Sequence, residues 1–315
     1  MKSILNIELP LIQAPMNFIS GPRLAAAVSN AGGMGVIGPN SGKDTYSTLS
    51  SRERRRRVFQ DARALTTKPL GVNIVLPEAD DDAGMAYAET TLEEAADAGL
   101  NAVFAVGGLH AKFFERVRAL GMNLVVRPLT PTPQLAKNAE GMGAQLIIAT
   151  GCDEGGWLPQ NDMGTFTIVP IIVDAVKVPV IAAGGINDIR GVRAAFALGA
   201  SGVYVGTRFI ASEECDASPR TKELLISNGN APIFRVSDEQ HSLSTSFSQD
   251  VGRIYRTEGQ GPASKLLDEK DAYYEGFVQG NFDNGIVCVN TGASLIKKVE
   301  PAASIVAELM ADFLK

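Results

Sequence analysis

Two neighbouring apolar segments of this sequence end on glycine, at Gly184-Gly185 and at Gly206-Thr207. Glycine has no Cβ, so the backbone N–H groups of such turns can approach an anion closely. The Thr207 hydroxyl adds one further hydrogen-bond donor. These turns predict a phosphate site, and the alternative is a pair of tight turns that bind nothing.

Polar residues also interrupt or follow other apolar segments. Asn73 lies inside the segment "GVNIV". An amide buried in an apolar strand needs hydrogen-bond partners, so Asn73 is either a satisfied structural amide or a contact for a bound polar ring. Further polar or flexible side chains stand where segments end, namely Met16, Asn17, Arg127 and Thr150.

Eight short segments rich in Val, Ile and Leu alternate with stretches of helical composition. Segments that are apolar on both faces are typical of buried parallel strands. The predicted strands are Leu11–Pro15, Gly35–Gly38, Leu70–Leu76, Ala102–Gly107, Asn123–Arg127, Gln145–Thr150, Val178–Ala183 and Gly202–Gly206. The predicted helices are Pro22–Ala31, Thr90–Ala98, His110–Leu120, Thr132–Gly141, Ile168–Val176 and Asp188–Leu198.

Eight strands that alternate with helices predict an α/β fold, the (β/α)8 TIM barrel, with a doubly wound sheet as the alternative. Barrel ligands bind at the C-terminal ends of the strands, and phosphate groups favour the loops after the last two strands. The two glycine turns follow the seventh and eighth predicted strands. The predicted fold therefore brings both turns to one phosphate position.

The chain of 315 residues is longer than the roughly 250 residues that one core usually supports. We expect residues 1–214 to form the barrel and residues 215–290 to form an inserted smaller lobe after strand 8, a lid or substrate lobe. In residues 291–315, Pro301 precedes an apolar stripe. This last segment predicts a C-terminal helix that packs on the barrel.

Composition excludes several classes of protein. The net charge of −6 and the pI near 5.1 argue against a nucleic-acid partner. The basic cluster 52–57 predicts a solvated helix face, and a contact with an acidic partner or a cofactor phosphate is the alternative. Three isolated cysteines and two distant histidines predict no metal site. We find no signal peptide or membrane span, so we expect a cytoplasmic protein without a membrane partner.

The sequence resembles the FMN-dependent nitronate monooxygenases (2-nitropropane dioxygenases) and their relatives, the FMN-dependent enoyl-acyl carrier protein reductases. The similarity spans nearly the whole chain outside residues 220–270. It rests on the blocks "IQAPM…LAAAVSNAGGMGVIG", "KPLGVNIVLP", "GCDEGGW", "VPVIAAGGINDIRGVRAAFALGASGVYVGTRF" and "GIVCVNTGASLIKKVEPAASIVAELM". The motif "QAPM" favours the monooxygenases, because the reductases more often carry "QGGM".

The resemblance implies FMN as cofactor and assigns residues to it. The flavin ring would lie against the backbone of Pro15, Met16 and Asn17, and Asn73 would hydrogen-bond to the flavin. Thr150 and Gly155 stand where the family contacts the cofactor after the sixth strand. The phosphate would lie against Gly184, Gly185, Tyr204, Val205, Gly206 and Thr207.

One position departs from the family. Where relatives carry a histidine after two small residues, this chain has Trp157, its only tryptophan. The exchange removes a general acid or base and supplies an apolar plate with one N–H donor. Trp157 either packs in the interior or lines the substrate pocket, and we take Trp157 and Arg127 as the candidate catalytic residues.

A missing histidine affects the candidate reactions differently. A nitronate is already a carbanion, so its oxidation by FMN and O₂ needs no protein base. An NAD(P)H-dependent enoyl, quinone or other ene reductase is the alternative, and the enoyl reaction needs a proton donor. A flavin-binding protein with lost or divergent biosynthetic activity is a second alternative, and a flavin-free phosphate-ester barrel is a third. The sequence predicts a small-molecule substrate, leaves a homodimer open, and does not identify the reductant.

Overall fold

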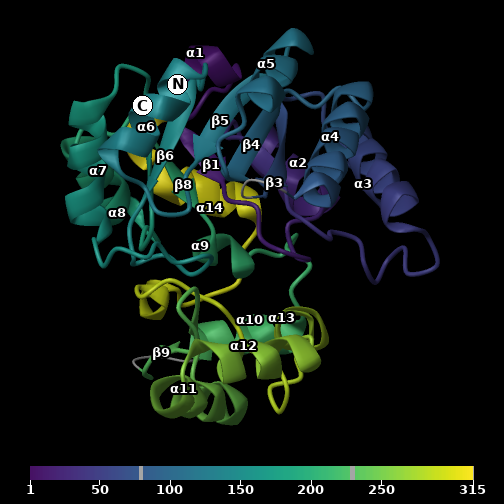
Figure 1. Ribbon diagram of the computed structural model, residues 1–315, viewed down its shortest axis with the longest axis vertical. Helices are drawn as coiled ribbons and strands as arrows, with labels where there is room; N and C mark the ends of the chain where they lie inside the picture. The colour runs from purple at the N-terminus through teal and green to yellow at the C-terminus, as the bar shows by residue number, and fades with distance from the viewer. Residues whose placement is uncertain (78–80, 228–230, 315) are drawn as a thin grey trace.

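The barrel forms the upper part of the molecule in Figure 1. A computed structural model describes residues 1–77, 81–227 and 231–314. Eight parallel strands follow the order β1-β8-β7-β6-β5-β4-β3-β2, and a bridge between Ile12 and Met34 brings the two edges together. The strands are β1 Leu11–Gln13, β2 Gly35–Ile37, β3 Leu70–Leu76, β4 Ala102–Gly107, β5 Asn123–Arg127, β6 Leu146–Thr150, β7 Val180–Ala183 and β8 Gly202–Val205.

This strand order confirms the predicted (β/α)8 barrel. The doubly wound sheet is wrong, because sequential strands stay neighbours without a reversal of order. Inside the barrel the side chains of Phe104, Ile148 and Ile181 form a packed core. Burial of one such side chain stabilises the fold by roughly 1.5–3 kcal/mol.

Helices cover the outside of the barrel. Several of them end where a glycine adopts the left-handed conformation, as at Gly99, Gly121 and Gly199. A larger apolar cluster between helices and strands seals this outer layer. The covering helices are α2 Pro22–Asn30, α3 Ser51–Leu65, α4 Asp82–Asp97, α5 Ala111–Ala119, α6 Pro133–Gly141, α7 Thr165–Ala175 and α8 Ile189–Ala197. The short helices α1 Lys2–Leu5 and α9 Thr207–Ile210 precede β1 and follow β8.

Helix α3 carries the basic cluster, and α4 begins earlier than predicted because Asp81 caps it. Arg52, Arg55 and Arg56 place their Nε atoms 2.8, 2.7 and 3.3 Å from the carboxylate of Glu94 on α4. That carboxylate is only 1% exposed. The predicted solvated helix face is therefore only partly correct, because three of the arginines bind a buried carboxylate on the neighbouring helix.

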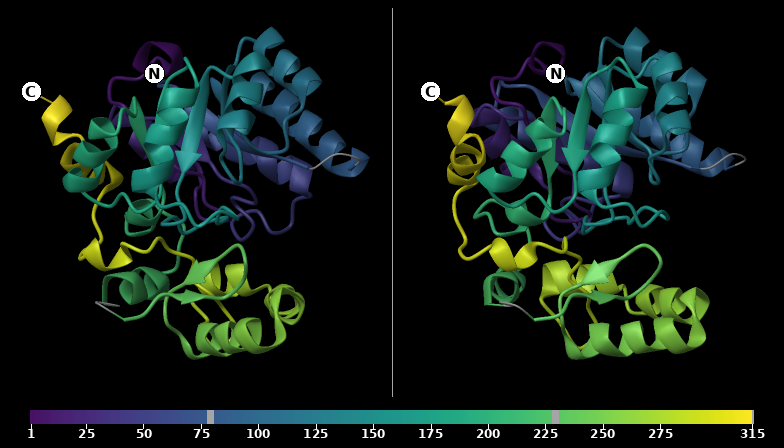
Figure 2. Two further views of the ribbon diagram at one scale, coloured as in Figure 1. Left: turned by 60° about the vertical axis from the view of Figure 1, so that its left-hand side comes forward. Right: turned by 90° about the vertical axis from the view of Figure 1, so that its left-hand side faces the viewer.

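The chain after β8 builds a second group of elements below the barrel (Figures 1 and 2). Sequence periodicity was too weak to define these elements. They are α10 Pro219–Ser227, β9 Phe234–Arg235, β10 His241–Ser242, α11 Ser246–Glu258, α12 Gln260–Glu269, α13 Ala272–Tyr274 and the π-helical turn Glu275–Gln279. We call residues 215–290 the lobe, and these bounds stay a proposal; residues 228–230 lie outside the described part of the chain.

The end of the chain returns to the barrel. Helix α14 Ala302–Leu309 contacts α2, α8 and α9, and Pro301 directly precedes it. Arg208 on α9 donates to Glu300 at 2.6 Å and to Glu308 at 3.2 Å. In the described ranges we find no helix that is long and apolar enough to cross a membrane.

Candidate active site

A cavity of about 610 Å³ lies at the C-terminal ends of the strands, where the lobe faces the barrel. This volume is typical of small-molecule and cofactor sites. From the barrel, the predicted residues that line it are Pro15, Met16, Asn17, Asn73, Arg127, Gly155, Trp157, Gly184, Gly185, Tyr204, Val205, Gly206 and Thr207. From the lobe, it is lined by Glu239, Gln240, Ser264, Leu267, Asp268, Tyr273, Phe277, Cys288 and Asn290.

One end of the cavity is built from bare backbone. Gly184 and Gly185 have φ angles of +107° and +71°, which side chains rarely adopt. A Cβ on Gly184 would lie 2.6 Å from Thr165 Oγ1. The backbone N–H groups of Gly185 and Gly206 donate to no other residue that the structure describes. These free donors and the lack of side chains fit a phosphate group, so the geometry suits the FMN phosphate.

Two amide side chains brace this phosphate end. Asn187 and Asn290 exchange two hydrogen bonds of 2.9 Å, and both residues are buried. The backbone N–H of Asn290 donates to Thr207 Oγ1 at 3.0 Å. Because that oxygen acts as acceptor, the Thr207 hydroxyl hydrogen stays available for a ligand. The carboxylate of Asp188 caps α8, so this helix terminus is occupied by its own side chain.

The barrel wall away from the glycine turns carries polar and aromatic side chains that could contact a flat ring. Asn73 is half-buried, and its side chain makes no hydrogen bond within the described residues. It therefore faces the cavity with free polar atoms and is not the satisfied structural amide of the alternative prediction. Tyr204 stacks on Phe104 with ring centroids 6.0 Å apart, which fixes the floor of the cavity. Asn17 accepts a hydrogen bond of 3.1 Å from Asn40.

Two predicted cofactor contacts have other partners. Thr150 is fully buried, does not line the cavity, and accepts a hydrogen bond from Arg127 Nε at 3.2 Å. Its position supports Arg127 rather than a ligand. Gly155 lines the cavity, but a Cβ there would also lie 2.2 Å from the carbonyl carbon of Val289. Position 155 therefore requires glycine because the backbone of Val289 lies so close to it.

Arg127 is the centre of a charged cluster in the cavity wall. Its Nη2 donates to the Glu154 carboxylate and, at 3.1 Å, to the Trp157 carbonyl. Its Nη1 has no partner within the described chain and is the donor left for a ligand. Trp157 is 47% exposed, so it lines the cavity and is not interior packing.

Burial raises the pKa of Glu154 from 4.5 to about 7, although Arg127 acts in the opposite direction. A group with this pKa exchanges protons near neutral pH. From the sequence, Glu154 could be either a proton donor or a plain loop carboxylate, because its own loop does not reveal its burial. No described histidine lines the cavity. His241 lies beside the Glu154 backbone, and burial lowers the pKa of its ring.

The lobe adds acidic side chains that the sequence did not single out. Glu239 and Asp268 both line the cavity. Burial and the nearby carboxylates of Asp238 and Asp268 raise the pKa of Glu239. No motif marks these residues, since they lie in polar stretches without periodicity. They make the lobe side of the cavity acidic, in contrast to the uncharged phosphate end.

A TIM barrel with a glycine-lined end that suits a phosphate, and with a large cavity at its strand ends, is typical of cofactor-dependent barrel enzymes. The family profile "Nitronate monooxygenase" matches residues 1–312, and the chain belongs to this family. It is 32% identical to a nitronate monooxygenase of Pseudomonas aeruginosa over 259 aligned residues, and the match covers 70% of this chain and 72% of the relative. The family and its enzyme relatives identify the chain as an FMN-dependent oxidoreductase.

Other relatives carry different names. A Rhodococcus jostii protein named (3aS,4S,5R,7aS)-5-hydroxy-7a-methyl-1-oxo-octahydro-1H-indene-4-carboxyl-CoA dehydrogenase is 33% identical over 226 residues, 72% of this chain and 59% of its own length. The structure of FabK from Thermotoga maritima matches with a TM-score of 0.84 at 30% identity, covering 99% of this chain and 95% of that chain. Nitroalkane oxidase from Streptomyces ansochromogenes shares the fold at 24% identity, with a TM-score of 0.81 and coverage of 100% and 98%.

Proposed function

We propose that this chain oxidises alkyl nitronates with dioxygen, using FMN bound in the large cavity. The observation that carries the proposal is a cavity wall with a free Arg127 nitrogen and an exposed tryptophan, and with no histidine among the described residues that line it. A nitronate has already lost its proton, so it needs an anion-binding group and no base. Membership of the nitronate monooxygenase family supports the same reaction.

The residues at the strand ends suit the cofactor. The amides of Gly185 and Gly206, with the Thr207 hydroxyl, would hold the phosphate, and Asn73 would hydrogen-bond to the ring. Bound FMN would supply the redox chemistry, accepting electrons from the substrate and passing them to dioxygen. The protein side chains then have to bind the anion, orient it and exclude water.

Arg127 and Trp157 would share the binding of the nitronate oxygens. Arg127 Nη1 is a charged donor, and Trp157 Nε1–H is a neutral one. Thr150, Glu154 and the Trp157 carbonyl hold the guanidinium in place through its other nitrogens. A guanidinium fixed in this way binds an oxyanion without first losing side-chain freedom.

Glu154 would tune the charge beside the substrate. When Glu154 is protonated, Arg127 presents a full positive charge to the nitronate. When Glu154 is ionised, its charge offsets that of Arg127 and repels the anion. Because the pKa of Glu154 is about 7, nitronate binding should be strongest on the acid side of neutrality.

The proposal is tested by oxygen consumption with a nitronate and with the neutral nitroalkane from which it derives. We expect turnover of the nitronate and little turnover of the neutral compound. Arg127→Met should raise KM for the nitronate by about 10–100-fold, since one charge-assisted hydrogen bond is lost. Arg253→Met removes a cation whose partner is the exposed Asp250, so it should leave KM unchanged. Equal turnover of both compounds would refute the proposal.

An NAD(P)H-dependent enoyl or quinone reductase is the second candidate. Two observations favour it: a buried carboxyl with a pKa of about 7 can donate a proton, and the FabK structure is similar over nearly the whole chain. Anaerobic addition of NADH or NADPH separates the candidates. Rapid bleaching of the flavin bands would support the reductase, and bands that persist until nitronate is added would support the oxidase. Bands that resist both reagents would indicate a flavin protein without turnover.

A further inference from the structure

The basic cluster on α3 contains one arginine that the fold leaves free. Three of its arginines bind Glu94, and Arg57 pairs with Asp61 at 3.1 Å. The side chain of Arg54 makes no hydrogen bond and no ion pair with any residue in the described ranges. An arginine that is half-buried and unpaired is uncommon, because its guanidinium has five donors to satisfy.

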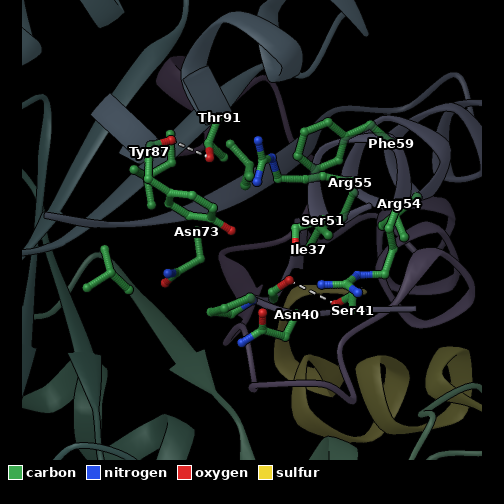
Figure 3. Close-up of a pocket in the computed structure, with 16 residues that line it drawn as sticks. Ile37, Asn40, Ser41, Ser51, Arg54, Arg55, Phe59, Asn73, Tyr87 and Thr91 are labelled. Atoms are coloured by element: carbon green, nitrogen blue, oxygen red, sulfur yellow. Dashed lines mark hydrogen bonds between the residues drawn. The ribbon is translucent and has the colours of Figure 1, made fainter. Parts of the chain in front are cut away.

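Arg54 points into a small second cavity (Figure 3). The figure shows its guanidinium directed toward Ser41 and Asn40. The cavity measures about 60 Å³, which is room for roughly four water molecules or one phosphate group. No acidic residue is among those that line it, whereas the large cavity has three carboxylates in its wall. The charge of this small cavity therefore suits an anion.

The small cavity adjoins the large one. Pro39, Asn40, Asn73 and Val75 line both. Asn73, the predicted flavin contact, thus stands between the cofactor site and Arg54. A ligand whose reactive end lies in the large cavity can pass Asn40 and Asn73 and place a charged group beside Arg54.

We propose that this small cavity, which we call the Arg54 pocket, binds the phosphate group of a second ligand that reacts at the FMN site. The guanidinium can give two parallel N–H bonds to phosphate oxygens. The Ser51 hydroxyl lines the same pocket and can give a third. A nicotinamide dinucleotide and a coenzyme A thioester share this phosphate chemistry. An alkyl nitronate carries no phosphate, so the pocket adds a ligand class to the proposed function.

The pocket is separate from the glycine turns. Gly184, Gly185 and Gly206 line only the large cavity, and the Arg54 pocket lies against β2, β3, α3 and α4. One phosphate would therefore belong to FMN and the other to the reacting partner. The proposal rests on the assignment of the large cavity to FMN, but its test needs no nitronate turnover, so the two ideas can fail independently.

The test is equilibrium binding to the oxidised, FMN-loaded protein, measured by titration calorimetry with NAD⁺, NADP⁺ and coenzyme A. None of these three probes reduces the flavin, so binding is observed without chemistry. Arg54→Ala should weaken the ligand that uses the pocket about tenfold, and added salt should weaken the wild type more than the variant. Lys137→Ala, an equal charge change on the exposed face of α6, should leave every Kd unchanged.

Each outcome decides the proposal. A loss confined to the dinucleotides identifies a nicotinamide cofactor as the ligand, and a loss confined to coenzyme A identifies a thioester. Arg54→Lys keeps the charge without the planar fork, so it should lie between wild type and Arg54→Ala, and it serves as the second variant if the alanine variant unfolds. Unchanged binding of all three probes in both variants, or no binding to the wild type, would overturn the proposal.

Discussion

The two ends of the large cavity are built in opposite ways. The end that we propose for the phosphate presents glycine backbone and one hydroxyl to the cavity, and no charged residue of the described chain lines it there. The end that we propose for the substrate consists of Arg127, Glu154 and the acidic lobe residues, which are charged and come from distant segments of the chain. Binding at the first end should therefore depend on backbone shape, and binding at the second on protonation and ionic strength.

The largest effect should come from the phosphate end. Gly184→Ala forces a side chain into a φ of +107° and places its Cβ against Thr165 Oγ1. We expect FMN affinity to fall by more than about tenfold, because the clash and a strain of roughly 1–2 kcal/mol would displace the turn that faces the phosphate. Gly121→Ala carries similar strain at φ +73° with nothing near its Cβ, so it should lose stability and keep FMN. Fluorescence titration of the apoprotein gives both affinities.

A pH effect of about tenfold should come from the substrate end. KM for a nitronate should rise between pH 6 and pH 8 as Glu154 ionises, and Glu154→Gln should remove that rise. The folded pKa is raised, so folded Glu154 keeps its proton between pH 4.5 and about 7 while the unfolded group loses it. Wild-type stability should fall across this window by up to about 1.4 kcal/mol per unit, and the variant should not show this fall. A pH-independent KM in the wild type would contradict this role.

Trp157→His should produce a gain of a few-fold in activity on neutral nitroalkanes. The new ring would stand on the cavity wall beside Arg127, where a base could reach the substrate. Trp157→Phe keeps the aromatic plate without the N–H donor and serves as the control. Steady-state rates on paired neutral and ionised substrates measure the gain. No gain, with an unchanged flavin spectrum, would mean that the side chain points away from the substrate.

The smallest effect should come from the lobe. Glu239→Gln removes one carboxylate from the cavity wall, so KM for an anionic nitronate should fall about two- to threefold. The effect is small because Glu239 is less buried than Glu154 and solvent screens its charge. Glu269→Gln on the exposed end of α12 is the matched control. A rise in KM would show that Glu239 helps to bind the substrate.

Sequence patterns predicted the barrel and its glycine turns well, because strand periodicity and turn chemistry are local properties. The eight strands end within a few residues of their predicted positions. Asn73 and Trp157 were visible for the same reason, as a polar residue in an apolar strand and a lone tryptophan in a motif. In a barrel both residues fall at or after the C-terminal ends of strands, so the predicted fold alone was enough to place Asn73 and Trp157 at the cavity.

The properties of the substrate end were not predictable, because they arise from contacts between distant segments. Glu154 acquires its raised pKa from burial that its own loop does not reveal. Thr150 ends a strand as predicted, yet its hydroxyl faces Arg127. The three arginines on α3 look solvated until α4 brings Glu94 beside them. Long-range packing decides each of these cases, and no local pattern encodes it.

The Asn187–Asn290 pair also bears on the order in which the protein is made. Its two members are 103 residues apart, and Asn290 is the last residue of the lobe. A ribosome therefore exposes both glycine turns well before it adds the amide that donates to Thr207. The growing chain has a phosphate site without its brace until the lobe is complete. We therefore expect tight FMN binding only once the chain has been translated through Asn290. A nascent chain that is halted within the lobe should release FMN readily.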